Sequence, residues 1–249
     1  MGRITGLRWF NLVAGLVHAA QAAAVLALAN DFTLPVTANY LAGPPGGGAF
    51  EAVALLDSPV GLGVALFLAL SAFFHFLVAF PGVFDRYRDG LLAGHNYFRW
   101  VEYSISSSVM IVLIAQLTGI ADVAALIAIF GVNASMILFG WLQEKYETPG
   151  GGWAPFIFGC IAGIVPWIAV VLYVISPNAS SAASPPGFVY AIIISLFVFF
   201  NTFAINQGLQ YGKVGPWRDY LVGERTYIIL SLVAKSVLAW QVFGGTLAD

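Results

Sequence analysis

The 249-residue chain is 60% hydrophobic and only 9% charged, and its mean hydropathy is +0.88. A soluble domain carries about 25% charged residues, so this composition excludes an ordinary soluble protein and indicates a chain that lies in a bilayer. The net charge of −2 with ten scattered cations argues against a nucleic-acid surface, and the single cysteine excludes an internal disulfide.

Seven segments are long and apolar enough to cross a bilayer, whose core of about 30 Å requires about 20 mostly apolar residues per helix. The first is too long for a cleavable signal peptide. We find no internal repeat, and therefore predict a single domain, residues 1–249, folded as an all-α, rhodopsin-like seven-helix membrane bundle. The expected spans are about 6–29, 58–84, 93–118, 121–143, 153–175, 187–210 and 217–244.

Turn-forming sequences separate these spans, and the loop between the first two is the longest. It contains GPPGGG at 43–48, and its flanks alternate weakly between apolar and polar residues, which predicts a short extracellular β-hairpin. The other loops are expected at DSP 57–59, DRYRDG 85–90, TPGGG 148–152, SPP 184–186 and GKVGP 212–216.

The distribution of Lys and Arg predicts the orientation in the membrane. Nine of the ten cations fall at the N-terminus, in the second, fourth and sixth loops, or near those ends of the spans. The positive-inside rule then places the N-terminus in the cytoplasm and the C-terminus outside, in a multi-pass protein of the cell membrane.

The tenth cation, Lys235, lies near the middle of the last span. A free ammonium there is costly, so it should be paired, deprotonated or consumed in a covalent bond. Glu102 in the third span is the only carboxylate that we expect well inside the membrane, and its depth allows a pair with Lys235. Such a pair either supports chemistry or only locks two helices together.

Several polar side chains are expected at a similar depth on the cytoplasmic side of Lys235. Their helical spacing predicts a polar, hydrated cavity, with plain hydrogen-bonded packing as the alternative. They are Ser231, Ser106, His18, Gln21, Ser71 and His75.

Three sequence stretches, together with the inverted charge bias, resemble those of the heliorhodopsins, a branch of the microbial rhodopsins. They read SLVAKSVLAW at 231–240, FRWVEYSISSS at 98–108 and FFNTFAINQGLQY at 199–211. The resemblance covers essentially the whole chain. It implies that Lys235 binds all-trans retinal covalently as a protonated Schiff base and that Glu102 is its counterion.

The resemblance also assigns the surroundings of the chromophore. Ser231 would lie near the Schiff base nitrogen, and the cavity beside it would be lined by His18, Gln21, Ser71, His75, Tyr103 and Ser106. The retinal pocket would contain Asn133, Met136, Trp167, Phe200 and Asn201. Pump-type rhodopsins usually carry a Trp where this chain has Phe200. A homodimer is implied as well, with the loop at 30–57 helping to pair the protomers.

The expected function is light sensing. Retinal would isomerise from all-trans to 13-cis, and the Schiff base proton would enter the cytoplasmic-side cavity. No net transport is expected, because the outer half of the spans carries no Asp or Glu and Asp122 lies at a span end. Movement of the loops at 85–95, 144–152 and 211–218 would then reach an unidentified cytoplasmic signalling partner.

Two alternatives remain. The first is a light-driven ion pump or light-gated channel with the same chromophore. The second is a membrane protein without retinal, in which Lys235 and Glu102 form a packing pair. An enzyme is not expected, because the sequence shows no nucleophile–base pair, no metal-ligand cluster and no phosphate-binding loop; GPPGGG lacks the Lys of a P-loop.

Overall fold

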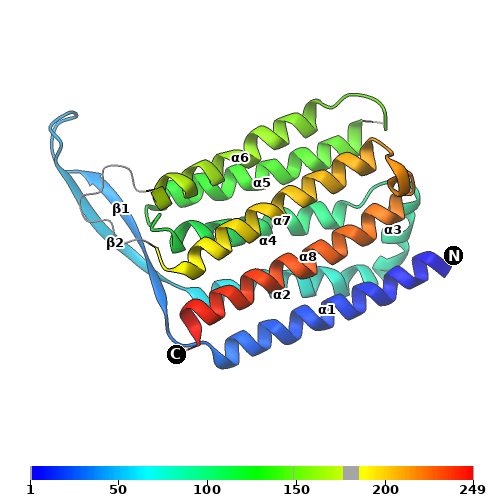
Figure 1. The fold of residues 1–249 in the computed structure, drawn as a ribbon, viewed down its shortest axis with the longest axis horizontal. Helices are drawn as coiled ribbons and strands as arrows, with labels where there is room; N and C mark the ends of the chain where they lie inside the picture. Colours follow the sequence, from blue (N-terminus) through cyan, green and yellow to red (C-terminus); the bar gives the residue numbers. More distant parts are fainter. Residues whose placement is uncertain (1, 148, 176–184, 249) are drawn as a thin grey trace.

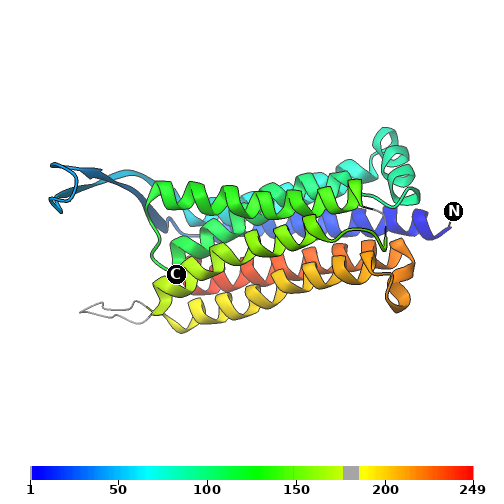
Figure 2. The same ribbon diagram turned by 90° about the horizontal axis from the view of Figure 1, so that it is seen from above.

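The structure is a computed structural model that describes residues 2–147, 149–175 and 185–248. In the described chain, seven helices are long and apolar enough to cross a membrane, which confirms the predicted architecture. They are α1 (Gly2–Leu28), α2 (Val60–Ala79), α4 (Tyr97–Leu117), α5 (Val123–Tyr146), α6 (Ala154–Ile175), α7 (Gly187–Tyr211) and α8 (Tyr220–Val242). They run side by side as one bundle (Figures 1 and 2). The protein is therefore a multi-pass membrane protein.

The two ends of the bundle differ, and we name them by what lies there. The hairpin end carries the only strands of the described residues, together with the C-terminal turn η2 (Phe243–Leu247). The N-terminal end carries the start of α1, the short helix α3 (Pro81–Leu92) and the 3-10 turn η1 (Gly215–Arg218) (Figure 1).

The long first loop forms the predicted antiparallel hairpin. Strand β1 (Thr33–Leu41) pairs with β2 (Phe50–Pro59), in a register that runs from Thr33 opposite Pro59 to Leu41 opposite Phe50. The GPPGGG turn places Gly46 at φ +87° and Gly48 at φ +70°, which side chains other than glycine rarely tolerate. The hairpin is fastened to the bundle because the Thr37 N–H donates to the Ala121 carbonyl at 2.8 Å.

The second predicted span, 58–84, is too long, and the predicted loop at 85–90 is helical. Helix α2 ends at Ala79 because Pro81 disfavours a helical conformation at Phe80, whose φ and ψ are −66° and 137°. Pro81 then starts α3, since proline suits the first helical position. Helix α3 runs across the axis of the bundle at its N-terminal end (Figure 2).

The third and seventh spans also begin later than predicted, at a capping residue in each case. The Asn96 side chain accepts from the Arg99 N–H at the start of α4, and the Asp219 side chain accepts from the Leu221 N–H at the start of α8. These oxygens satisfy backbone donors that the first helical turn leaves free.

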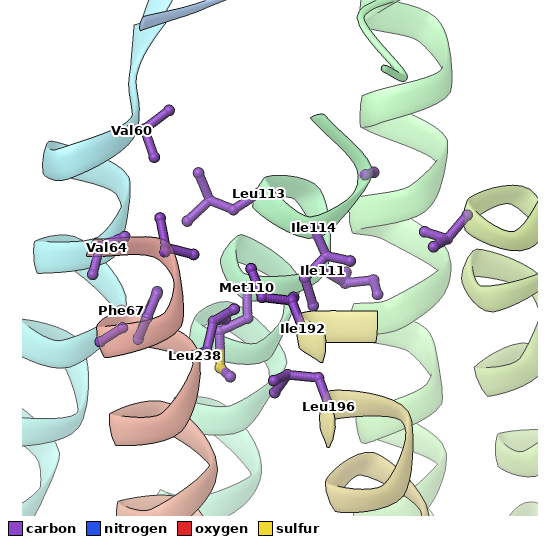
Figure 3. Packing of buried hydrophobic residues seen from close by; sticks show 14 of the residues in the cluster. Val60, Val64, Phe67, Met110, Ile111, Leu113, Ile114, Ile192, Leu196 and Leu238 are labelled. Carbon is purple, nitrogen blue, oxygen red and sulfur yellow. The ribbon is translucent and has the colours of Figure 1, made fainter. Parts of the chain in front are cut away.

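The hydrophobic core fills the hairpin half of the bundle (Figure 3). Side chains from α2, α4, α7 and α8 meet there, and each of those labelled is at most 3% exposed: Val60, Val64, Phe67, Met110, Ile111, Leu113, Ile114, Ile192, Leu196 and Leu238. Polar side-chain contacts concentrate in the other half. The interior of the bundle is therefore mainly apolar in its hairpin half and more polar in its N-terminal half.

Candidate functional site

Lys235 is buried in the middle of the bundle and contacts three oxygen atoms. Its Nζ donates to Glu102 Oε1 at 2.6 Å, to Ser71 Oγ at 2.5 Å and to Ser231 Oγ at 3.1 Å. Ser71 in turn donates to Glu102 Oε1 at 2.7 Å. The lysine and the carboxylate that the sequence placed at compatible depths therefore form a buried ion pair.

Helices α2, α4 and α8 together build this cluster. Ser231 lies one turn before Lys235 on α8, so both side chains point to the same face. Tyr103 follows Glu102 on α4, and Lys235 Nζ lies 5.1 Å from the centre of its ring. The Tyr103 hydroxyl donates to the Tyr227 carbonyl at 3.0 Å, which ties α4 to α8 beside the pair.

An apolar cavity opens on one side of Lys235. Lys235, Ser231, Ser106 and Ser107 supply its polar groups, and the remaining lining is Tyr103, Met110, Met136, Ile137, Phe200, Phe203 and Ala234. The Ser106 hydroxyl is buried and has no hydrogen-bond partner among the described residues.

A second cavity lies on the N-terminal side of Glu102 and is rich in polar groups. Its lining includes Ser71, His75, Glu102 and Tyr103 from the predicted set. It also includes residues that the sequence analysis did not assign to a cavity: Asn11, Phe74, Val78, Tyr87, Asn96, Phe98, Arg99, Glu224, Tyr227 and Ile228.

Hydrogen bonds run from His75 through this cavity wall to α8. His75 Nδ1 lies 2.7 Å from Asn11 Oδ1, and Asn11 Nδ2 donates to the Tyr87 hydroxyl at 3.2 Å. Tyr87 donates to Glu224 Oε1 at 3.0 Å. Burial, with the Glu224 carboxylate nearby, raises the pKa of Tyr87 well above its ordinary value, so this phenol stays a proton donor.

Glu102 is not the only carboxylate buried in the bundle, because Glu224 is buried as well, nearer the N-terminal end. Glu224 is 2% exposed, and its carboxylate is paired with Arg99. Arg99 also pairs with Glu144 at 2.7 Å, so one cation joins α4, α5 and α8. Glu224 lies on the same face of α8 as Ser231 and Lys235, because it precedes them by seven and eleven residues, but this spacing does not by itself indicate that Glu224 is buried.

Four of the residues predicted to line the polar cavity do not line it: Ser106 and Ser231 line the apolar cavity instead, and Gln21 and His18 line neither. Gln21 accepts from the Trp240 indole at 3.0 Å, towards the outside of the bundle, and is not among the cavity-lining residues. His18 is fully buried and stacks on His75 with 5.6 Å between ring centres, but neither of its nitrogens has a hydrogen-bond partner in the described chain.

The predicted retinal-pocket residues divide into three groups. Met136 and Phe200 line the apolar cavity, and Trp167 packs edge-on behind Phe200 with 5.4 Å between ring centres. Asn133 instead donates to the Ser107 and Ser108 hydroxyls at 2.8 and 3.0 Å. Asn201 was placed wrongly: it is exposed, and its amide donates to the Phe197 carbonyl of its own helix.

A comparison of the sequence with protein-family models identifies the family of this chain. The heliorhodopsin model matches residues 7–247, and so covers all seven helices and the site. The chain belongs to the heliorhodopsin family. It is therefore a retinal-binding microbial rhodopsin. No curated protein sequence matches it.

The heliorhodopsin fold of this chain is similar to that of a solved rhodopsin structure. The match is a light-driven proton pump from Leptosphaeria maculans, with a TM-score of 0.68, 16% sequence identity and coverage of 98% of this chain and 96% of that one. At this identity the likeness establishes the seven-helix fold and not the activity.

The residues present suit a retinal group. The apolar cavity ends at a buried primary amine, which is the group that condenses with an aldehyde, and a carboxylate lies beside that amine. Met136, Phe200 and Phe203 supply adaptable and aromatic surface for a conjugated hydrocarbon. The unpartnered Ser106 hydroxyl supplies a polar contact within the same cavity.

Proposed function

We propose that this heliorhodopsin is a light sensor in which Lys235 holds all-trans retinal as a protonated Schiff base and Glu102 is the counterion. The observation that carries the proposal is the buried Lys235–Glu102 pair, 2.6 Å apart, at the polar end of an apolar cavity. Retinal, when bound, supplies the absorption of visible light and the isomerisation from all-trans to 13-cis.

The protein groups around the lysine nitrogen would control its proton. Glu102 and Ser71, whose oxygens accept from Nζ in the unmodified lysine, would be the groups that hold this proton before light absorption. After light absorption, Glu102 or the polar cavity next to it would take the proton. His75 lies in that cavity, where Asn11 fixes the orientation of its ring.

We further propose that the proton returns and that no net ion transport occurs. Among the described residues, the charged side chains that are buried lie either at the site or on its N-terminal side: Arg99, Glu102, Glu224 and Lys235. Asp122, in the hairpin half, caps α5 at the end of the membrane span. A proton leaving Lys235 thus has carboxylate acceptors in one direction only.

The alternative is a light-driven ion pump or a light-gated channel with the same chromophore. The solved structure similar in fold is that of a proton pump, so the fold itself allows transport. Light-induced pH changes and photocurrents in cells that express the protein separate the two functions. A sustained directional signal contradicts the sensor proposal.

The signal would leave at the N-terminal end, which we propose is cytoplasmic. Arg99 connects α4, α5 and α8 through Glu144 and Glu224, so a displacement near Lys235 on α8 is transmitted to two other helices. The segments at 85–95, 144–152 and 211–218, as far as the structure describes them, belong to this end and would contact an unidentified signalling partner.

The absorption of visible light tests whether retinal is attached to Lys235. Protein produced with all-trans retinal should absorb visible light, and Lys235→Ala should be colourless. Lys213→Ala, at the N-terminal end and far from the cavity, should keep the wild-type colour. A colourless wild type, or a coloured Lys235→Ala protein, contradicts the proposed attachment.

A further inference from the structure

A groove on the outside of the bundle lies between α2, α3 and α4 at the N-terminal end. Aromatic and aliphatic side chains dominate the lining, and no carboxylate is among them: Phe74, Leu77, Arg86, Tyr87, Gly90, His95, Asn96, Tyr97, Phe98 and Val101. The groove therefore combines a largely apolar surface with the positive charge of Arg86.

The charge of Arg86 is not neutralised by its neighbours on α3. The adjacent carboxylates, Asp85 and Asp89, are both bound by Arg88, at 2.7 and 2.9 Å. Arg86 is exposed, and the described part of the chain gives it no ion pair. A cation in this state attracts an external anion.

The groove also spans the boundary between membrane and water. Helix α3 starts two residues after the membrane span α2 ends at Ala79, so Arg86 lies near the level of the lipid headgroups. Phe74 and Val101 lie within the spans, at the depth of acyl chains. Basic pockets in such positions suit lipid headgroups.

We propose that this groove binds one anionic phospholipid, with its phosphate at Arg86 and an acyl chain along Phe74, Leu77, Phe98 and Val101. A molecule with a charged head and an apolar tail matches both parts of the groove. The bilayer also presents such molecules at this depth at high concentration, whereas a second copy of the chain would need a protruding surface to fill a concave site.

The bound lipid would contact the wall of the polar cavity beside Lys235. Phe74, Tyr87, Asn96 and Phe98 line both the groove and that cavity. Two of them also orient a buried carboxylate: Tyr87 donates to Glu224 at 3.0 Å and Asn96 donates to it at 2.8 Å. A lipid bound in the groove would therefore contact side chains that also line the polar cavity beside Lys235.

Lipid retention by the full-length protein tests this proposal. Purified protein is reconstituted into vesicles of phosphatidylglycerol or phosphatidylcholine with identical acyl chains and is then extracted again. Native mass spectrometry then identifies and counts the lipids that remain bound. Wild type should retain one phosphatidylglycerol in preference to phosphatidylcholine. Arg86→Gln should lower phosphatidylglycerol retention about fivefold, and Val101→Trp, which fills the groove, should lower retention of both lipids.

The matched control is Lys145→Gln, which removes an exposed cation at the same end of the bundle that does not line the groove, and it should retain lipid like the wild type. Equal retention of the two lipids by the wild type overturns the proposal, as does an equal effect of Arg86→Gln and Lys145→Gln. A disulfide between two copies through Val101→Cys, made with Cys160→Ser, would show that a second copy fills the groove and would also overturn it.

Discussion

Lys235 is stabilised in the apolar interior by acceptors from three helices. An isolated ammonium at this depth is costly, and breaking a buried pair leaves the other charge uncompensated. Glu102, Ser71 and Ser231 together accept from Nζ. Loss of either charge in this cluster should therefore change the electrostatics at the proposed site of retinal attachment.

Glu102→Gln should shift the visible absorption to longer wavelength. The carboxylate 2.6 Å from Nζ localises positive charge at the nitrogen, and its removal lets that charge spread along the conjugated chain. Absorption spectra across a pH series measure the effect. Glu51→Gln on the exposed hairpin should leave the spectrum unchanged, and an unshifted Glu102→Gln spectrum contradicts the counterion role.

Arg99→Gln should destabilise the protein strongly, because it leaves Glu144 and Glu224 buried without their cation. Removing one partner of a buried pair costs about 3–5 kcal/mol in the free energy of unfolding. Thermal unfolding followed by circular dichroism measures the loss. Arg88→Gln removes a solvent-exposed pair and should have little effect; equal melting temperatures for the two variants would refute a structural role for the buried cluster.

The sequence identified Lys235, Glu102, Ser71 and Ser231 because helical spacing places polar side chains on one face of an apolar helix. It missed Asn11 and Glu224 for a physical reason. Glu224 lies only four residues after the start of α8, where a carboxylate usually reaches water. Its burial depends on Tyr87 of α3 and on Asn96, which no local pattern connects to α8.

At the scale of elements, the local sequence predicted the hairpin but not α3. Helix α3 begins at Pro81, where the chain leaves the direction of α2. Alternation and the glycine turn predicted β1 and β2. The sequence predicts a loop at 85–90 between two apolar spans, yet the charges of this segment lie on one side of an amphipathic helix whose Tyr87 and Leu91 are buried against the bundle. Helix α3 therefore packs against the N-terminal end of the bundle.

Asp122→Ala should lower stability modestly and loosen the hairpin. Its side chain accepts from the Ala124 and Ala125 N–H groups, and such a cap contributes about 1 kcal/mol. It also accepts from Asn39 Nδ2 of β1 at 3.3 Å. Asp122→Asn, which still caps, should melt closer to the wild type, and hydrogen exchange in β1 should rise only in the alanine variant. Identical melting of all three proteins would contradict the capping role.

At the scale of the whole molecule, the charge bias predicts a cytoplasmic N-terminal end. We expect Gly47→Cys at the hairpin turn, in a Cys160→Ser background, to react with a membrane-impermeant maleimide in intact cells. Asp89→Cys on α3 should react only after permeabilisation. The reverse pattern of labelling would invert the orientation and place the signalling surface outside.

The exposed apolar surface of the hairpin is consistent with the expected homodimer. Tyr40, Leu41, Phe50, Leu55 and Leu56 are all at least 45% exposed. Replacing both Leu55 and Leu56 by Glu should convert a dimer to a monomer, as measured by light scattering in detergent. Glu51→Gln should remain dimeric, and a dimer that survives the double substitution would place the interface elsewhere.

The sequence by itself determined the seven spans and the hairpin, and it predicted the orientation and the depths that allow a lysine–carboxylate pair. All of these follow from apolar length, alternation, cation placement and residue spacing along single helices. Only the tertiary structure decided which residues share a cavity. Burial of Glu224, the connection of three helices by Arg99 and the groove beneath α3 each require side chains from elements far apart in the chain, whose distances depend on how the helices pack.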